Sequence, residues 1–108
     1  MASDSKRQLA NFIIDKAFEP VMRARPDGRP DAQRKMLQHV QEATRAEIER
    51  YRGYGSAAEL VTNFKRDLTS APAKKVHAQL HRLGLPTIAD FKDEFERRAR
   101  DLGVREHG

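Results

Sequence analysis

Apolar residues recur three and four positions apart throughout this chain, and that spacing is the feature that most limits its fold. Such a repeat places apolar side chains on one side of an α-helix, whereas alternating apolar and polar residues are typical of a half-buried strand. No stretch of useful length alternates in this way. The chain has 108 residues, the length of one ordinary domain. The sequence therefore predicts a single small all-α domain, with four or five helices in an irregular bundle.

Proline, glycine and capping residues set the boundaries of the predicted helices. We expect helices over residues 5–18, 31–52, 57–68, 71–83 and 88–102. Pro20 has no amide hydrogen and disfavours a helical residue before it, so the first helix should end or kink there. Ser56-Ala57-Ala58-Glu59 matches a capping box, and Ser70 is the expected cap of the following helix. Residues 1–4 and 105–108 are predicted to be disordered.

The junction between the last two predicted helices has a local signature at each end. Gly84 is expected to adopt the left-handed conformation that closes a helix, with Leu85 against Leu80 as in a Schellman ending. Thr87, followed three residues later by Asp90, is expected to cap the next helix. The stretch is therefore predicted to be chiefly a structural junction.

The apolar stripes also predict which side chains face the core. In the helix over residues 31–52 the stripe includes Ala43, and in the helix over residues 71–83 it includes Val76 and Leu80. Hydrophobic residues amount to only 38% of the chain, so these stripes must be narrow. We expect all three side chains to face inward.

Two histidines four residues apart, His77 and His81, have the spacing at which a helix can present two imidazoles to one metal ion. The glutamate that follows the first histidine in helical zinc hydrolases is absent, since Ala78 stands there. The neighbouring Lys74 and Arg82 disfavour another cation. We therefore interpret the pair as ordinary histidines at the edge of the buried face, and we predict no metal and no cofactor.

Charge is the most informative functional feature of the sequence. The net charge is +5, and residues 56–86 contain five basic and only two acidic residues. Lysines in the opening turns of a helix are slightly unfavourable with the helix dipole, which suggests that a bound anion favours them there. The candidate binding residues for an anion, a nucleic acid or a protein partner are Lys65, Arg66, Ser70, Lys74, Lys75, His77, His81 and Arg82.

Sequence motifs of catalysis are missing, so we predict that the chain is not an enzyme. It contains no cysteine, no glycine-rich phosphate loop and no nucleophile elbow. Near the start of the last helix, Asp93, Glu94 and Glu96 each have an arginine one turn later, as on a solvated helix face. No run is long and apolar enough for a membrane span, and no signal peptide is evident, so we expect a cytoplasmic protein with no membrane contact.

The function that these observations favour is a non-enzymatic interaction or regulatory module. It would act through the basic surface around the third and fourth predicted helices. A nucleic-acid-binding protein that contacts phosphates through the same surface is the alternative, and a metal-binding protein or enzyme is a remote one. The wide apolar band of the first helix makes self-association into a homodimer a further expectation.

Overall fold

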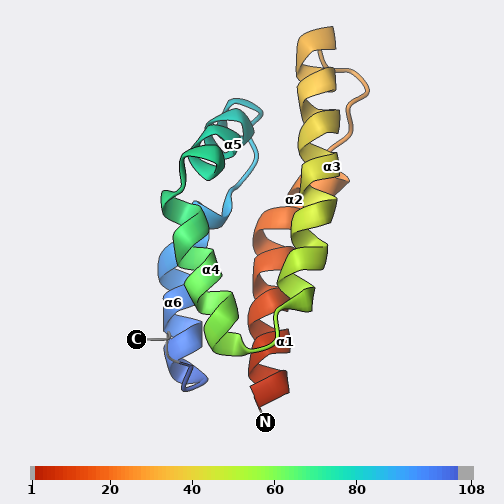
Figure 1. Cartoon of the computed structure of the whole chain (residues 1–108). Helices are drawn as coiled ribbons and strands as arrows, with labels where there is room; N and C mark the ends of the chain where they lie inside the picture. Colours follow the sequence, from red (N-terminus) through yellow and green to blue (C-terminus); the bar gives the residue numbers. More distant parts are fainter. Residues whose placement is uncertain (1, 105–108) are drawn as a thin grey trace.

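The computed structural model describes residues 2–104, and every regular element among them is helical (Figure 1). The elements in chain order are α1 (Ala2–Ile13), the π-helical turn η1 (Ile14–Phe18), α2 (Glu19–Arg23), α3 (Asp31–Gly53), α4 (Ala57–Thr69), α5 (Ala71–Arg82), the 3₁₀ turn η2 (Ile88–Phe91) and α6 (Lys92–Asp101). The first three join without a break, as do the last two. The described residues thus form five helical segments, which confirms the predicted all-α fold.

The first helical segment differs from the prediction at both of its ends. It begins at Ala2 rather than Ser5, so residues 2–4 are helical and not disordered. Asp4 pairs with Arg7 at 2.9 Å, and an acidic residue in a first turn suits the helix dipole. The disorder predicted for residue 1 and residues 105–108 concerns positions outside the described residues.

Pro20 neither ends the first helix nor leaves it regular. The helix widens into the π-helical turn η1 just before the proline and then continues through α2 to Arg23. π-helix is rare and occurs mostly as single turns inside α-helices, and here such a turn precedes the residue that cannot donate an amide hydrogen bond. The helix therefore does not end at Pro20. The predicted irregularity is confirmed only as a local distortion of a continuous helix.

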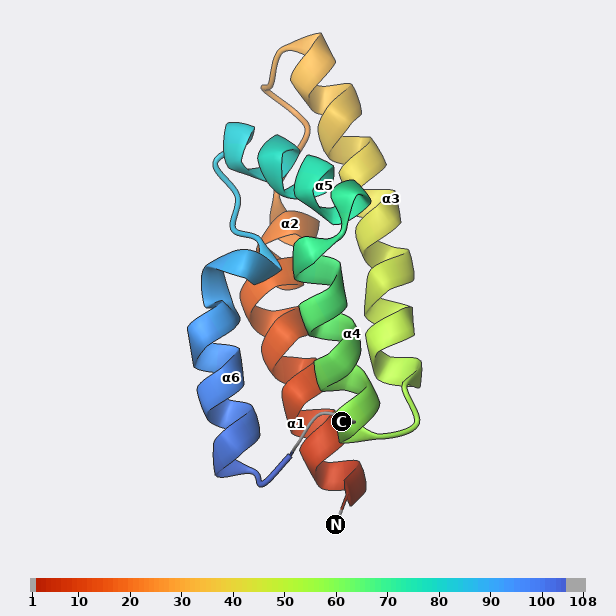
Figure 2. The same cartoon turned by 60° about the vertical axis from the view of Figure 1, so that its left-hand side comes forward.

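The main core lies where α1 packs against both α4 and α6 (Figure 2). Leu9, Leu60, Phe64 and Phe95 are almost completely buried there. The rings of Phe64 and Phe95 have centroids only 4.0 Å apart. Burial of such large apolar side chains from three helices makes this lower part of the molecule its most continuous core.

A smaller core lies at the opposite end, where Val21 of α2, Val40 of α3 and Leu80 of α5 meet. These three residues join α5 to α3, while α5 also contacts α4. The structure is elongated, with principal extents of 46 × 23 × 19 Å. Two separate apolar clusters leave room between them for a cleft.

The predicted caps are confirmed, each with a specific hydrogen bond. The amide of Glu59 donates to Ser56 Oγ at 3.1 Å, and the Glu59 carboxylate accepts from the amide of Gly55 at 2.8 Å. The amide of Ala73 donates to Ser70 Oγ at 3.3 Å. Local sequence signals therefore placed the starts of α4 and α5 correctly.

The Schellman ending of α5 is also confirmed. Gly84 has φ of +74°, and the amide of Leu85 donates to the carbonyl of Leu80 at 2.9 Å. Thr87 and Asp90 then open the last helix as predicted, because the amide of Thr87 donates to Asp90 Oδ2 at 2.9 Å. The first turn after this cap is the 3₁₀ turn η2 rather than an α-helix.

A candidate binding cleft between two helices

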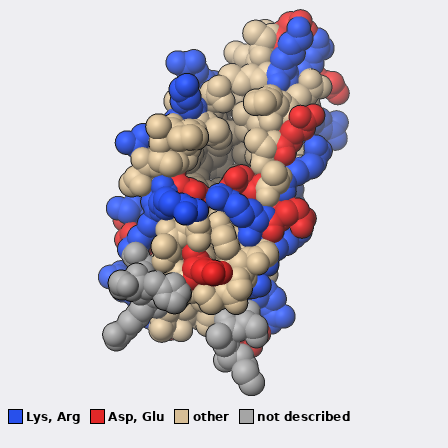
Figure 3. All heavy atoms as spheres, in the orientation of Figure 1, with Lys and Arg blue, Asp and Glu red and all other residues tan. Residues whose placement is uncertain are grey.

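A cleft of about 310 Å³ opens between α3 and α5. Its floor is formed by η1 and η2, and Figure 3 shows it as the hollow between the two arms of the molecule. The walls are largely apolar, and the apolar residues that decide its character are Phe18, Ala43, Val76, Leu80 and Ile88. Pockets that bind small molecules or anchor side chains occupy roughly 300–1,000 Å³, so this cleft lies at the small end of that range.

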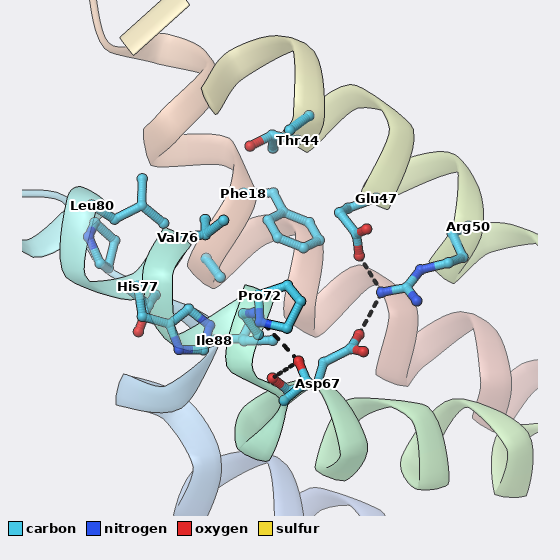
Figure 4. Close-up of a pocket in the computed structure, with 16 residues that line it drawn as sticks. Phe18, Thr44, Glu47, Arg50, Asp67, Pro72, Val76, His77, Leu80 and Ile88 are labelled. Carbon is cyan, nitrogen blue, oxygen red and sulfur yellow. Dashed lines mark hydrogen bonds and ion pairs between the residues drawn. The ribbon is translucent and has the colours of Figure 1, made fainter. Parts of the chain in front are cut away.

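Val76 lies at the edge of this cleft and is not buried, contrary to the prediction. Its exposed fraction is 37%, whereas Leu80, one turn later on the same side of α5, is only 6% exposed. The difference arises because Leu80 packs in the small core with Val21 and Val40, whereas Val76 lines the open cleft. Figure 4 shows Val76 beside Phe18, with both residues lining the cleft.

Ala43 on the α3 side of the cleft is likewise exposed rather than buried. The predicted stripe of α3 is correct for Leu37, Val40 and Thr44, which are buried. Ala43 faces the cleft instead of another helix, so its short side chain leaves the space open. An apolar stripe predicts the direction of a side chain but not whether a neighbouring helix covers it.

The end of the cleft next to α4 is polar and charged. Arg50 of α3 pairs with the carboxylates of Glu47 and Asp67 (Figure 4). Tyr51 Oη donates to Asp67 Oδ2 at 3.0 Å. The Asp67 side chain is only 15% exposed, so this network is partly removed from water. Burial, and the nearby Asp67 carboxylate, raise the pKa of the Tyr51 hydroxyl, which therefore stays protonated.

His77 lines the cleft, whereas His81 does not. Burial of His77, and the nearby His81, lower the pKa of His77 below its ordinary value. The exposed His81 has Nε2 at 3.3 Å from both oxygens of Asp90. The amide of Thr87 stabilises the Asp90 carboxylate and lowers its pKa. Among the described side chains, no three His, Cys, Asp or Glu residues lie close enough together to hold a metal ion.

The predicted basic residues of α5 lie on the outside of that helix. Lys74, Lys75 and Arg82 are exposed, and none of them makes an ion pair with the described part of the chain. Ser70 lines the cleft and caps the helix, accepting from Ala73. The carbonyl of Ser70 also accepts from the amide of Lys74 at 3.1 Å. Because these amides are occupied, an anion here would depend mainly on the lysine side chains.

The two predicted basic residues of α4 are not part of the cleft lining. Lys65 lines a separate groove with Glu96 and Arg100 of α6. Arg66 is exposed and donates to the side chain of Asn63. Of the eight residues predicted from the sequence, the cleft brings together only Ser70 and His77. Sequence reasoning missed the cleft residues Phe18, Glu47, Arg50 and Asp67.

Comparisons with known proteins do not assign this site. No protein-family model matches the sequence, and neither a curated protein nor a solved structure shows significant similarity to it. Within the part of the chain that the structure describes, no helix is both long and apolar enough to cross a membrane. The cleft and the charges around it are therefore the features of this molecule that bear on its function.

Proposed function

We propose that this chain is a non-enzymatic, cytoplasmic interaction module that binds a protein partner in the cleft between α3 and α5. The observation that carries the proposal is Val76, a large hydrophobic side chain that is 37% exposed at the edge of an apolar cleft. Among the described residues, it is the one large hydrophobic side chain counted as exposed. A partner side chain in the cleft would remove both Val76 and Phe18 from water.

The arrangement of charges supports a protein partner for this cleft. The predicted basic surface flanks it through Lys74 and Lys75 on the exposed side of α5. Protein interfaces commonly combine a small apolar centre with a polar rim that excludes water. Helix α5 contributes to both parts, with Val76 in the cleft and Lys74 and Lys75 on its exposed side.

A pair of substitutions on opposite sides of α5 tests the proposal. Val76→Asp places a carboxylate in the cleft, and Ala78→Asp places the same group on the exposed outer side of the same helix. We expect the unmodified chain and Ala78→Asp, used as baits in native extracts, to retain the same protein, and Val76→Asp to lose it. Circular dichroism of both variants controls for folding.

Two results of the bait experiment would contradict the proposal. One is a partner that both variants retain equally, because binding would then occur away from the cleft. The other is that the unmodified chain retains no protein that depends on Val76. If the protein retained is a second copy of the same chain, light scattering will show a dimer, and the interaction is then the predicted homodimer.

We keep nucleic-acid binding as a second candidate because Lys74, Lys75 and Arg82 are exposed on α5 without an ion-pair partner among the described residues. Binding through phosphates weakens steeply as salt increases. Titration of a labelled duplex and a labelled single strand at low and high salt tests it, with the Lys74→Ala/Lys75→Ala double variant as the comparison. No binding at low salt would remove this candidate.

A further inference from the structure

The backbone of the cleft walls limits what kind of peptide can bind there. Both walls are helices, α3 and α5, whose backbone amides and carbonyls are used within the helices themselves. The described residues contain no strand, so they present no sheet edge to which an extended peptide could add. An α-helix suits such walls because it satisfies its own backbone hydrogen bonds, whereas an extended segment would leave its backbone groups to water.

The side chains of the cleft favour an apolar anchor on that helix. Phe18 and Ile88 form an apolar floor, and Val76 extends it to the surface (Figure 4). On the walls, Ala43 and Ala73 are short and leave space for a second helix to approach. An amphipathic helix with one apolar side fits such a groove, with residues three and four apart as its anchors.

The charges near the opening favour acidic residues beside that anchor. Lys75 is adjacent to Val76 in the chain and lies about 100° further around α5, so its exposed side chain flanks the opening of the cleft without lining it. Lys75 makes no ion pair with any described residue. The carboxylate of Asp67, by contrast, already has Arg50 as a partner. The net charge of +5 also attracts acidic segments over longer distances.

We infer that the cleft between α3 and α5 binds an acidic amphipathic helix of a partner protein. An apolar side chain of that helix enters the cleft against Val76 and Phe18, and its carboxylates lie opposite Lys75. This inference rests on the proposed function, because it names the chemistry of the partner that the cleft would hold. It adds the secondary structure and the charge of the bound segment.

Two synthetic helical peptides of equal length test the inference. Both carry leucines three and four positions apart, one with glutamates beside them and the other with lysines in the same places. Fluorescence anisotropy measures affinity, circular dichroism measures helicity, and ¹H–¹⁵N NMR spectra of the intact chain locate the bound peptide. We expect the acidic peptide to bind at least tenfold more tightly, with the largest shifts at Phe18, Ala43 and Val76.

Charge-reversal variants provide the matched control. Lys75→Glu and Lys92→Glu change the net charge equally, but Lys92 lies exposed at the start of α6 and does not line the cleft. We expect Lys75→Glu to weaken the acidic peptide at least fivefold more than Lys92→Glu does. Equal effects of the two variants would show that only the overall charge matters and would overturn the inference.

The remaining outcomes separate this inference from the proposed function. Tighter binding of the basic peptide in the cleft overturns the acidic chemistry while leaving the cleft as a docking site. Failure of both peptides, or shifts located elsewhere, overturns the inference even if the bait experiment retains a protein that depends on Val76. If the unmodified chain retains no protein that depends on Val76 in the bait experiment, the proposed function itself is contradicted.

Discussion

The hydroxyl group of Tyr51 on α3 donates a hydrogen bond of 3.0 Å to the carboxylate of Asp67 on α4. Arg50, next to Tyr51 in the chain, pairs with the same carboxylate. Tyr51 itself is completely buried. These contacts join α3 to α4 at one end of the cleft, while Val40 and Leu80 join α3 to α5 at the other. The width of the cleft therefore depends on two small sets of contacts.

Removal of the Asp67 carboxylate should destabilise the fold more than removal of the Tyr51 hydroxyl. Tyr51→Phe loses one hydrogen bond and should lower the free energy of unfolding by about 1 kcal/mol. Asp67→Ala leaves both Tyr51 and Arg50 without this partner and should cost about 2–3 kcal/mol. Urea denaturation measures both, with Glu47→Ala at the more exposed side of the network as the control. Equal costs for the first two variants would contradict this account.

Phe95 should contribute more to stability than its neighbour Phe91. Phe95 is completely buried against Phe64, with ring centroids 4.0 Å apart, whereas Phe91 is only partly buried. Phe95→Ala should lower the free energy of unfolding by about 3–5 kcal/mol, through lost burial and the cavity left behind. Phe91→Ala should cost less than half as much. Chemical denaturation compares them, and a larger loss for Phe91→Ala would place the main core elsewhere.

Two glycines should respond to alanine in opposite directions. Gly84 has φ of +74°, so Gly84→Ala should cost about 1–2 kcal/mol through backbone strain alone, because no described atom lies within 4 Å of the added carbon. Gly53 ends α3 without a positive φ, and the same space is open around it. Gly53→Ala should therefore stabilise the protein by about 0.5 kcal/mol. Thermal melts should show the melting temperature falling for one variant and rising for the other.

The half-buried His77 should make stability depend on pH below neutrality. Burial and His81 lower its pKa in the folded state, so the unfolded chain binds the proton more tightly, at the ordinary pKa of about 6.5. The free energy of unfolding should then decrease as the pH falls from 7 through 6.5 and below. His77→Gln should lose this dependence.

Denaturation at several pH values between 5.5 and 7 measures the difference between the two proteins. Asp90, whose pKa is also lowered, titrates below this range and does not interfere. An identical pH dependence in His77→Gln would contradict the assignment to His77.

Local features of the fold could be predicted from the sequence because neighbouring residues determine them. Gly84 closes α5 with its own hydrogen bonds, and Ser56 caps α4 through Glu59 only three residues later. Pro20 was a weaker signal for a helix end. The helix continues past it, with a π-helical turn just before the proline, which has no amide hydrogen to donate. Local signals therefore predicted the caps at helix ends well. They did not predict that the first helix continues past Pro20.

The cleft could not be predicted because its residues come from four separated segments. Phe18, Ala43, Val76 and Ile88 are brought together only by the packing of η1, α3, α5 and η2. Periodicity assigned Val76 to the same inward stripe as Leu80, but only Leu80 reaches the small core. The charge excess was correct as a composition, yet Lys65 and Lys75 lie on different helices, and Lys65 lines a separate groove with α6.

Photo-crosslinking from position 76 tests most directly whether the cleft is a protein-binding site. A photoreactive amino acid at position 76, with the same group at position 78 on the outer side of α5 as the control, is activated in native extracts. The account predicts that position 76 forms a covalent adduct with a distinct protein and that position 78 does not. Adducts formed equally from both positions, or from position 78 alone, would contradict it.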